Sequence, residues 1–260
     1  MKKLQIATAA LFAVMLAVFC AVMLYHGTAV DKTPPQLSCD SEELVISVSD
    51  PESALLAGVH ARDDRDGDLT AAVMIKSISQ LITDDTAQVT YIVFDSSNNM
   101  ATLTRRVRYS DYEKPRFALS APLNFTVGDK LALLDRLTAR DVVDGDISGS
   151  ICVISQNVKD EPGVYTVTVQ VTNSLGDAAT LPLKLVVSQL NGTDCVELTD
   201  YLIYLEQGSE FHAPDYVRGS AEGLRVEGTV DTRQPGVYHV RYSRDGQEKT
   251  ADVYLTVVVA

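Results

Sequence analysis

The sequence predicts an all-β fold, arranged as a row of small β-sandwiches, behind one N-terminal transmembrane helix. Three observations predict it: an apolar run near the N-terminus, short segments in which apolar and polar residues alternate, and a stretch of sequence that recurs further along the chain. Hydrophobic residues make up 46% of the 260 residues, which is enough to form buried cores. Val, Ile, Thr and Tyr are abundant beyond residue 25, and these residue types favour strands.

The apolar run covers residues 4–25 and contains no charged side chain. As a helix it would be about 33 Å long, which suffices to cross a hydrocarbon layer of about 30 Å. Lys2 and Lys3 precede it, so the positive-inside rule places residues 1–3 in the cytoplasm and the rest of the chain outside. The sequence therefore predicts a single-pass protein of the cell membrane with extracellular C-terminal modules.

A cleaved signal peptide is the alternative, because Gly27-Thr28-Ala29 has the small residues of a cleavage site. The apolar core of a signal peptide is typically about 7–15 residues long, which is shorter than this run. The length therefore favours an uncleaved anchor.

Small residues follow one face of the expected helix, and four-residue spacing aligns Ala9, Ala13, Ala17 and Ala21. Such a face lets two helices approach closely, so self-association in the membrane is one interpretation. The other is that alanine is simply common in membrane helices.

Three short motifs recur at one offset, which indicates two copies of a module. Ala61-Arg62-Asp63 returns as Ala139-Arg140-Asp141, 78 positions later (139 minus 61). Asp66-Gly67-Asp68 returns at 144–146, and Ala101-Thr102-Leu103 returns at 179–181, both at the same offset. Repetition without a gap indicates one structural unit used twice.

A third, diverged copy follows, because Pro162-Gly163-Val164-Tyr165 returns at 235–238 before another alternating segment. Alternation with period two predicts an antiparallel strand with one buried face. Each module closes with a strand, expected at 103–109, 181–187 and 253–259, after a polar turn at 95–99, 173–177 and 244–247. We expect modules at residues 33–110, 111–190 and 191–260.

The order of these motifs resembles the bacterial surface protein Ig-like domain family (domain of unknown function 5011), which is related to HYR-type modules. The resemblance rests on Ala-Arg-Asp-x-x-Asp-Gly-Asp, then Pro-Gly-Val-Tyr, then a polar turn and a final strand, and covers roughly residues 33–260. It implies tandem immunoglobulin-like β-sandwiches that act as surface display, spacer or binding elements, not as enzymes. Module three lacks Asp-Gly-Asp at 214–223, and module one lacks Pro-Gly-Val-Tyr at 85–88.

The formal net charge of −13 bears on the partners. An acidic surface repels nucleic-acid phosphates, so we expect no nucleic-acid partner. Another protein or a cell-envelope polymer is expected instead. A secreted module that accompanies an enzyme or acts as an inhibitor, released by signal cleavage, is the alternative.

Three aspartates lie within six residues in each of the first two modules, and their carboxylates are the hard ligands that Ca²⁺ prefers. The candidate ligands are Asp63, Asp66, Asp68, Asp141, Asp144 and Asp146. A Ca²⁺-stiffened, adhesin-type array is one hypothesis on this basis. In the other interpretation, the same carboxylates accept hydrogen bonds from the backbone amides of their own loops, in Asx turns.

No motif for catalysis or for a cofactor accompanies the four histidines, and His239 is expected on a wet strand face. We therefore expect no enzyme activity. Cys39, Cys152 and Cys195 lie outside the membrane segment, and their spacing leaves open one disulfide with a free thiol or three thiols.

Overall fold

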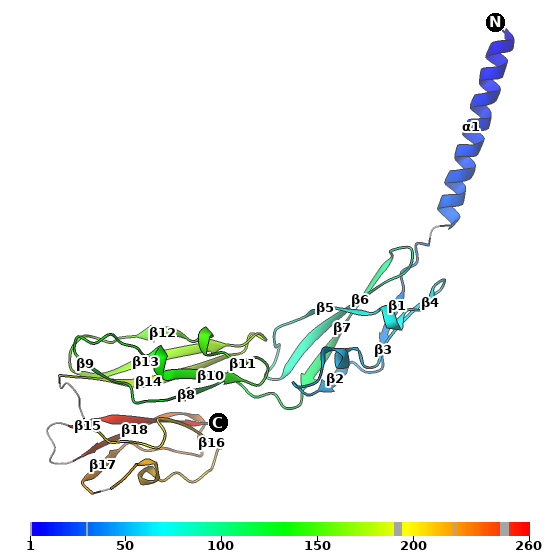
Figure 1. Cartoon of the computed structure of the whole chain (residues 1–260). Helices are drawn as coiled ribbons and strands as arrows, with labels where there is room; N and C mark the ends of the chain where they lie inside the picture. The colour runs from blue at the N-terminus through cyan, green and yellow to red at the C-terminus, as the bar shows by residue number, and fades with distance from the viewer. Residues whose placement is uncertain (1, 30, 190–193, 221, 245–249) are drawn as a thin grey trace. The chain divides into compact units, whose positions relative to one another are not determined.

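The computed structural model describes residues 2–29, 31–189, 194–220, 222–244 and 250–260. The chain divides into two compact units, Met1–Ser110 and Asp111–Ala260. Apart from one N-terminal helix and short 3-10 turns, the regular elements in the described residues are β-strands (Figure 1). The predicted fold class, all-β sandwiches with one N-terminal apolar helix, is confirmed.

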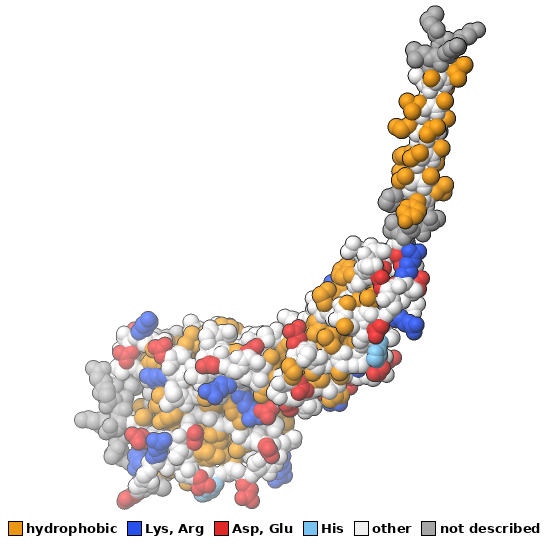
Figure 2. Space-filling model, turned by 45° about the vertical axis from the view of Figure 1, so that its right-hand side comes forward, with side chains coloured by type: hydrophobic (Ala, Val, Ile, Leu, Met, Phe, Trp, Pro, Cys, Tyr) orange, Lys and Arg blue, Asp and Glu red, His pale blue; other side chains and the backbone are white. Residues whose placement is uncertain are grey.

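Helix α1 (Lys2–Ala29) carries the apolar run. Its segment Gln5–Tyr25 has a mean hydropathy of 2.6 and no buried residue. Phe12 and Leu24 are 69% and 70% exposed, and Figure 2 shows hydrophobic side chains along the helix between its two grey ends. A helix of this length and composition can cross a membrane, although signal sequences share these properties.

The β part of the first unit consists of two sheets that face each other. The smaller sheet has the order β1-β3-β4, and the larger has the order β2-β7-β6-β5. Its strands are β1 (Gln36–Cys39), β2 (Glu43–Ile46), β3 (Val59–Asp63), β4 (Gly67–Asp68), β5 (Met74–Ile78), β6 (Thr86–Phe94) and β7 (Met100–Tyr109). Val59 and Ala61 of β3 share one buried cluster with Tyr91 and Val107 of the larger sheet. This arrangement is a β-sandwich.

Alternation along β6 explains this core. Val89, Tyr91 and Val93 have no exposed surface, because residues at every second position of a strand share one face. The Tyr91 hydroxyl is satisfied inside the core, where it donates to the carbonyl oxygen of Leu55 at 2.6 Å.

The second unit begins with another pair of sheets, ordered β11-β10-β8 and β12-β13-β14-β9. The strands are β8 (Arg116–Leu119), β9 (Asn124–Thr126), β10 (Leu137–Asp141), β11 (Gly145–Asp146), β12 (Cys152–Gln156), β13 (Gly163–Thr172) and β14 (Ala178–Ser188). Leu137, Ala139, Val169 and Leu183 lie in the buried cluster between these sheets.

The remaining strands of the second unit form a four-stranded sheet, β16-β20-β18-β17, and a short pair, β15-β19. Their bounds are β15 (Asp194–Cys195), β16 (Leu202–Leu205), β17 (Leu224–Glu227), β18 (Gly236–Arg244), β19 (Thr250–Ala251) and β20 (Val253–Val259). Val240, Tyr242 and Leu255 are fully buried in this part.

One strand arrangement recurs three times along the chain. In each four-stranded sheet, a short first strand pairs in parallel with the last strand: β2 with β7, β9 with β14, and β16 with β20. That last strand also forms the central hairpin, with β6, β13 or β18. The predicted repeat motifs therefore lie in elements with matching sheet order.

Two parts of the second unit pack on each other, which is why residues 111–260 form one compact unit. Leu202, Val237 and Val258 of the last sheet contact the core cluster of the preceding sandwich. The backbone N–H of Phe117 donates to the hydroxyl of Tyr204 at 2.9 Å. The predicted start of module three at residue 191 lies outside the described residues.

Two of the three predicted closing strands are longer than expected. Strand β7 begins at Met100 and β14 begins at Ala178, because their hairpins stay paired up to the turn. Asn98 adopts a φ of 64° in the first turn, a conformation that Asn tolerates. Most of the third predicted turn, at 244–247, lies outside the described residues.

Candidate functional site

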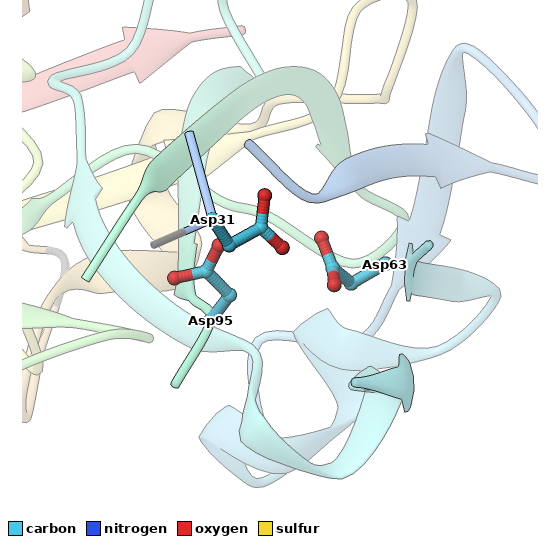
Figure 3. A group of neighbouring side chains, drawn as sticks. All are labelled: Asp31, Asp63 and Asp95. Carbon is cyan, nitrogen blue, oxygen red and sulfur yellow. The ribbon is translucent and has the colours of Figure 1, made fainter. Parts of the chain in front are cut away.

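Three buried aspartates meet at one end of the first sandwich. Asp31 lies in the segment before β1, Asp63 is the last residue of β3, and Asp95 follows β6. One carboxylate oxygen from each lies within 4.8 Å of the other two. The residues are only 5%, 4% and 6% exposed, and Figure 3 shows their carboxylates gathered together.

Each of these carboxylates is positioned by its own loop. Oδ1 of Asp63 accepts the backbone N–H groups of Arg65 and Asp66, both at 2.9 Å. Oδ1 of Asp31 and Oδ1 of Asp95 accept the N–H two residues further along, again at 2.9 Å. These are Asx turns, which fix the side chain without using its second oxygen.

The second oxygens are the unusual feature of the cluster. Oδ2 of Asp31 and Oδ2 of Asp63 are buried and have no hydrogen-bond partner. One of them has a cation beside it, since Nε of Arg65 lies 3.5 Å from Oδ2 of Asp31, although the Arg65 side chain is half exposed. A buried carboxylate oxygen that accepts no hydrogen bond is costly, so this arrangement calls for a further positive partner.

Asn99 connects two members of the cluster. Its Nδ2 lies 2.7 Å from Oδ2 of Asp95 and 3.1 Å from the carbonyl oxygen of Asp31. It thereby holds the segment that follows α1 against the β6–β7 turn. The backbone amides of Asp66 and Arg65 lower the pKa of Asp63, so this carboxyl is ionised at neutral pH.

The other predicted ligands of the first module have different partners. Asp66 accepts the backbone N–H of Ser96 at 2.7 Å and its hydroxyl at 2.9 Å. Asp68 accepts the N–H of Thr70 at 2.9 Å, and this residue lowers the pKa of the Asp68 carboxyl. The structure therefore groups Asp63 with Asp31 and Asp95, and not with Asp66 and Asp68.

The second copy of the motif follows the same hydrogen-bonding plan. Asp141 accepts the N–H of Asp144 at 3.1 Å, and Asp144 accepts both the N–H and the hydroxyl of Ser174. Asp146 accepts the N–H of Ser148 at 3.0 Å, and the Ser148 contacts lower the Asp146 pKa. The Asx-turn interpretation therefore describes Asp141 and Asp146, as it does Asp63 and Asp68. Asp144, like Asp66, instead binds a serine of the neighbouring turn.

The second copy nevertheless differs where the first has its third carboxylate. Asn173 stands at the position of Asp95, and its Nδ2 donates to Oδ2 of Asp141 at 3.1 Å and to the Tyr112 hydroxyl at 2.8 Å. The Tyr112 hydroxyl donates in turn to Asp177 at 2.8 Å, while burial raises the Tyr112 pKa. Here the second carboxylate oxygen of Asp141 is satisfied by an amide.

A groove of about 710 Å³ in the first unit is lined by Cys39, Asp40, Ser41 and Arg105, among others. Burial raises the pKa of the Cys39 thiol, which keeps it protonated and a poor nucleophile. No disulfide is present among the described residues. The expectation that the chain is not an enzyme stays a prediction.

His239 differs from its expected place on a wet strand face. It is only partly exposed, and its Nδ1 lies 3.3 Å from the buried hydroxyl of Thr256. Burial, together with the positive charge of Lys184, lowers the pKa of His239 to about 4. Lys184 belongs to β14, so a charge from the neighbouring sandwich lies close enough to act on this histidine.

We expect His239 to make the second unit less stable as the pH falls. An unfolded chain binds this proton near pH 6.5, whereas the folded chain binds it only near pH 4. The stabilising contribution is therefore complete above pH 6.5 and is lost as the pH falls towards 4. Discounted for the partial exposure of the side chain, the loss should be about 1–2 kcal/mol.

Urea unfolding of the wild type and of His239→Gln between pH 4 and pH 7.5 measures this loss. The difference in unfolding free energy between the two proteins should change across the window. A constant difference would show that His239 does not carry the effect.

Comparisons with known proteins add little to this geometry. No protein-family model matches the chain, and a search of curated proteins finds no match. Similar solved structures include the CBM51-2 and INT domains of Clostridium perfringens ZmpB in complex with GlcNAc (18% identity, 56% of this chain and 26% of that one, TM-score 0.25). A second is the protocadherin GammaB4 extracellular domain (11% identity, 88% of this chain and 51% of that one, TM-score 0.24). A third is the lipoprotein BT2262 from Bacteroides thetaiotaomicron (13% identity, 85% of this chain and 98% of that one, TM-score 0.22).

This chain spans about a quarter of the length of the first of these structures and about half of the second. TM-scores in this range carry no argument about function. The function has to be inferred from the chain itself.

Proposed function

We propose that this chain is a membrane-anchored surface protein whose Ig-like modules act as a non-catalytic spacer, display or binding element. Helix α1 carries the proposal, because it is apolar on all sides and none of Gln5–Tyr25 is buried against the rest of the chain. An all-apolar helix is stable in water only if protein covers it, so a lipid bilayer is the natural environment for this one.

Features of the β-modules support a role outside the cell. The net charge of −13 favours solubility and disfavours nucleic acid, which leaves a protein or a cell-envelope polymer as the class of partner. The packing of two sandwiches in residues 111–260 suits a stiff spacer.

Two further parts belong to this proposal. One is membership of the domain of unknown function 5011 family, with its display role. The other is self-association of the helix through Ala9, Ala13, Ala17 and Ala21.

The anchor is tested by a charge in the centre of the helix. Val14→Arg should disfavour membrane insertion by about 2.5–3.5 kcal/mol, because a guanidinium is poorly solvated among lipid tails. In cells, the wild type and the matched control Val14→Leu should appear in the membrane fraction with an intact N-terminus. The Arg variant should be depleted from that fraction.

Mass spectrometry of the N-terminus distinguishes the anchor from its alternative. A soluble mature protein that begins just after Ala29 would contradict the anchor and support a secreted module. Protease added to intact cells should remove the β-modules and spare the first residues, if the N-terminus lies in the cytoplasm.

A further inference from the structure

We propose that Asp31, Asp63 and Asp95 bind one Ca²⁺ ion, which ties the segment leaving α1 to the first β-sandwich. The site is distinct from the Asp-x-x-Asp-Gly-Asp ligand set expected from the sequence, because it uses only Asp63 from that motif. The proposal does not depend on the display role of the protein.

Two buried carboxylate oxygens that accept no hydrogen bond point to a ligand. Asp31 and Asp63 are both more than nine-tenths buried, and Oδ2 of each accepts no hydrogen bond. A bound cation satisfies both oxygens at once. Two oxygens at 2.3–2.6 Å from one Ca²⁺ ion can be at most about 5 Å apart. One carboxylate oxygen from each of the three residues lies within 4.8 Å of the other two, so a single ion can reach all three residues.

The charges favour a divalent cation over a proton. Three carboxylates and the guanidinium of Arg65 leave two negative charges, which a single Ca²⁺ ion neutralises. Each Oδ1 already accepts backbone N–H groups, and such bonds favour the ionised carboxylate. Water and further protein oxygens would complete the six to eight ligands of Ca²⁺.

The second unit provides an internal comparison. The hydrogen bond from the backbone N–H of Ser96 to Asp66 has a counterpart there, from the N–H of Ser174 to Asp144. The loops around the two sites are therefore alike. The difference lies in the ligands, since Asn173 replaces Asp95 and donates to Asp141. Where the third carboxylate is absent, the amide has taken the role that we assign to the cation.

The direct test uses the full chain in detergent micelles, stripped with EDTA and titrated with CaCl₂. Ca²⁺ that binds only the folded state raises the melting temperature of the first unit. At a free Ca²⁺ concentration of about 100 times the dissociation constant, the melting temperature should rise by on the order of 10 °C. MgCl₂ at the same concentration should act more weakly, because Mg²⁺ gives up its water reluctantly. An absent Ca²⁺ response overturns the proposal.

Asp63→Asn is the decisive variant. It keeps the Oδ1 that accepts two backbone amides and puts an amide donor in place of the unpaired Oδ2. In EDTA it should melt at or above the wild-type temperature, and the Ca²⁺ response should vanish. Asp31→Asn follows the same logic if the first variant does not fold.

Two control variants separate this site from general binding to an acidic surface. Asp68→Asn and Asp141→Asn should keep the full Ca²⁺ response, because neither side chain belongs to the cluster. If Asp63→Asn responds to Ca²⁺ as the wild type does, the ion binds elsewhere and the proposal fails.

Limited proteolysis tests the tie itself. Lys32 is exposed and directly follows Asp31, so trypsin can cut there and release the β-modules as a fragment that begins at Thr33. Ca²⁺ should slow this cut at least several-fold in the wild type and should have no effect in Asp63→Asn. Equal rates with and without Ca²⁺ in the wild type would contradict the tie. Membrane fractionation of the wild type should be unaffected by EDTA, so the two proposals can fail separately.

Discussion

Tyr204→Ala is expected to lower the free energy of unfolding of residues 111–260 by about 3–5 kcal/mol. The Tyr204 hydroxyl accepts the backbone N–H of Phe117, and the Arg116 guanidinium lies 5.4 Å from the centre of its ring. Removing the side chain leaves that N–H unpaired and opens the cavity of about 430 Å³ that Tyr204 already lines. Because these contacts join the two parts of this unit, we expect residues 111–260 to unfold in one transition in the wild type and in two in the variant.

Calorimetry of the full chain, before and after the substitution, measures both effects. Tyr204→Phe is the graded control, since it removes only the hydroxyl and should cost about 1–2 kcal/mol. If the unfolding of this unit is unchanged in Tyr204→Ala, the two sandwiches are not coupled through this residue.

Strand positions were the most predictable part of the fold, and their ends were the least. The alternation of Val89, Tyr91 and Val93 places β6 directly, because one face of the strand must be buried. Met100 and Ala178 were missed as strand starts. Their neighbours are small or polar, and hairpin pairing next to a turn is made by the backbone, which leaves no pattern in the side chains.

Periodicity also failed to show which outward faces are covered. Tyr204 and His239 lie on strands of the last sheet, and alternation assigned His239 to solvent. In the structure this side of the sheet meets the preceding sandwich: Tyr204 accepts a hydrogen bond from Phe117, and the charge of Lys184 helps to lower the pKa of His239. A pattern within one strand distinguishes the two faces of a sheet, but it does not distinguish water from a neighbouring module.

The candidate site was found in part. The repeated acidic motif predicts Asp63, whereas Asp95 falls in a predicted turn and Asp31 lies before the first predicted module. These three residues come together only through the pairing of the sheets, which a spacing rule does not describe. One signal was present: Asp95 and Asn99 recur in exchanged form as Asn173 and Asp177. Such an exchange indicates that the polar groups of these turns face a common neighbour.

Leu183→Ala is expected to destabilise the second unit by about 2–5 kcal/mol, because Leu183 has no exposed surface and belongs to the buried core cluster of this unit. It pairs with Val167, as Leu255 pairs with Val240 in the last sheet. Urea unfolding followed by circular dichroism measures the loss. A loss below about 1 kcal/mol would mean that the neighbouring side chains collapse into the space.

The same position in the first unit gives the matched variant. Arg105 pairs there with Val89 and is only 5% exposed, yet its guanidinium donates to the carbonyl oxygen of Ala57 at 2.7 Å and to the Ser41 hydroxyl at 2.6 Å. Its Nε is buried without a partner. Arg105→Leu removes two hydrogen bonds but also a buried charge, so we expect stability to change by less than about 1.5 kcal/mol. A much larger loss would show that the buried arginine holds the Ser41 and Ala57 segments in place, a role that a leucine cannot take over.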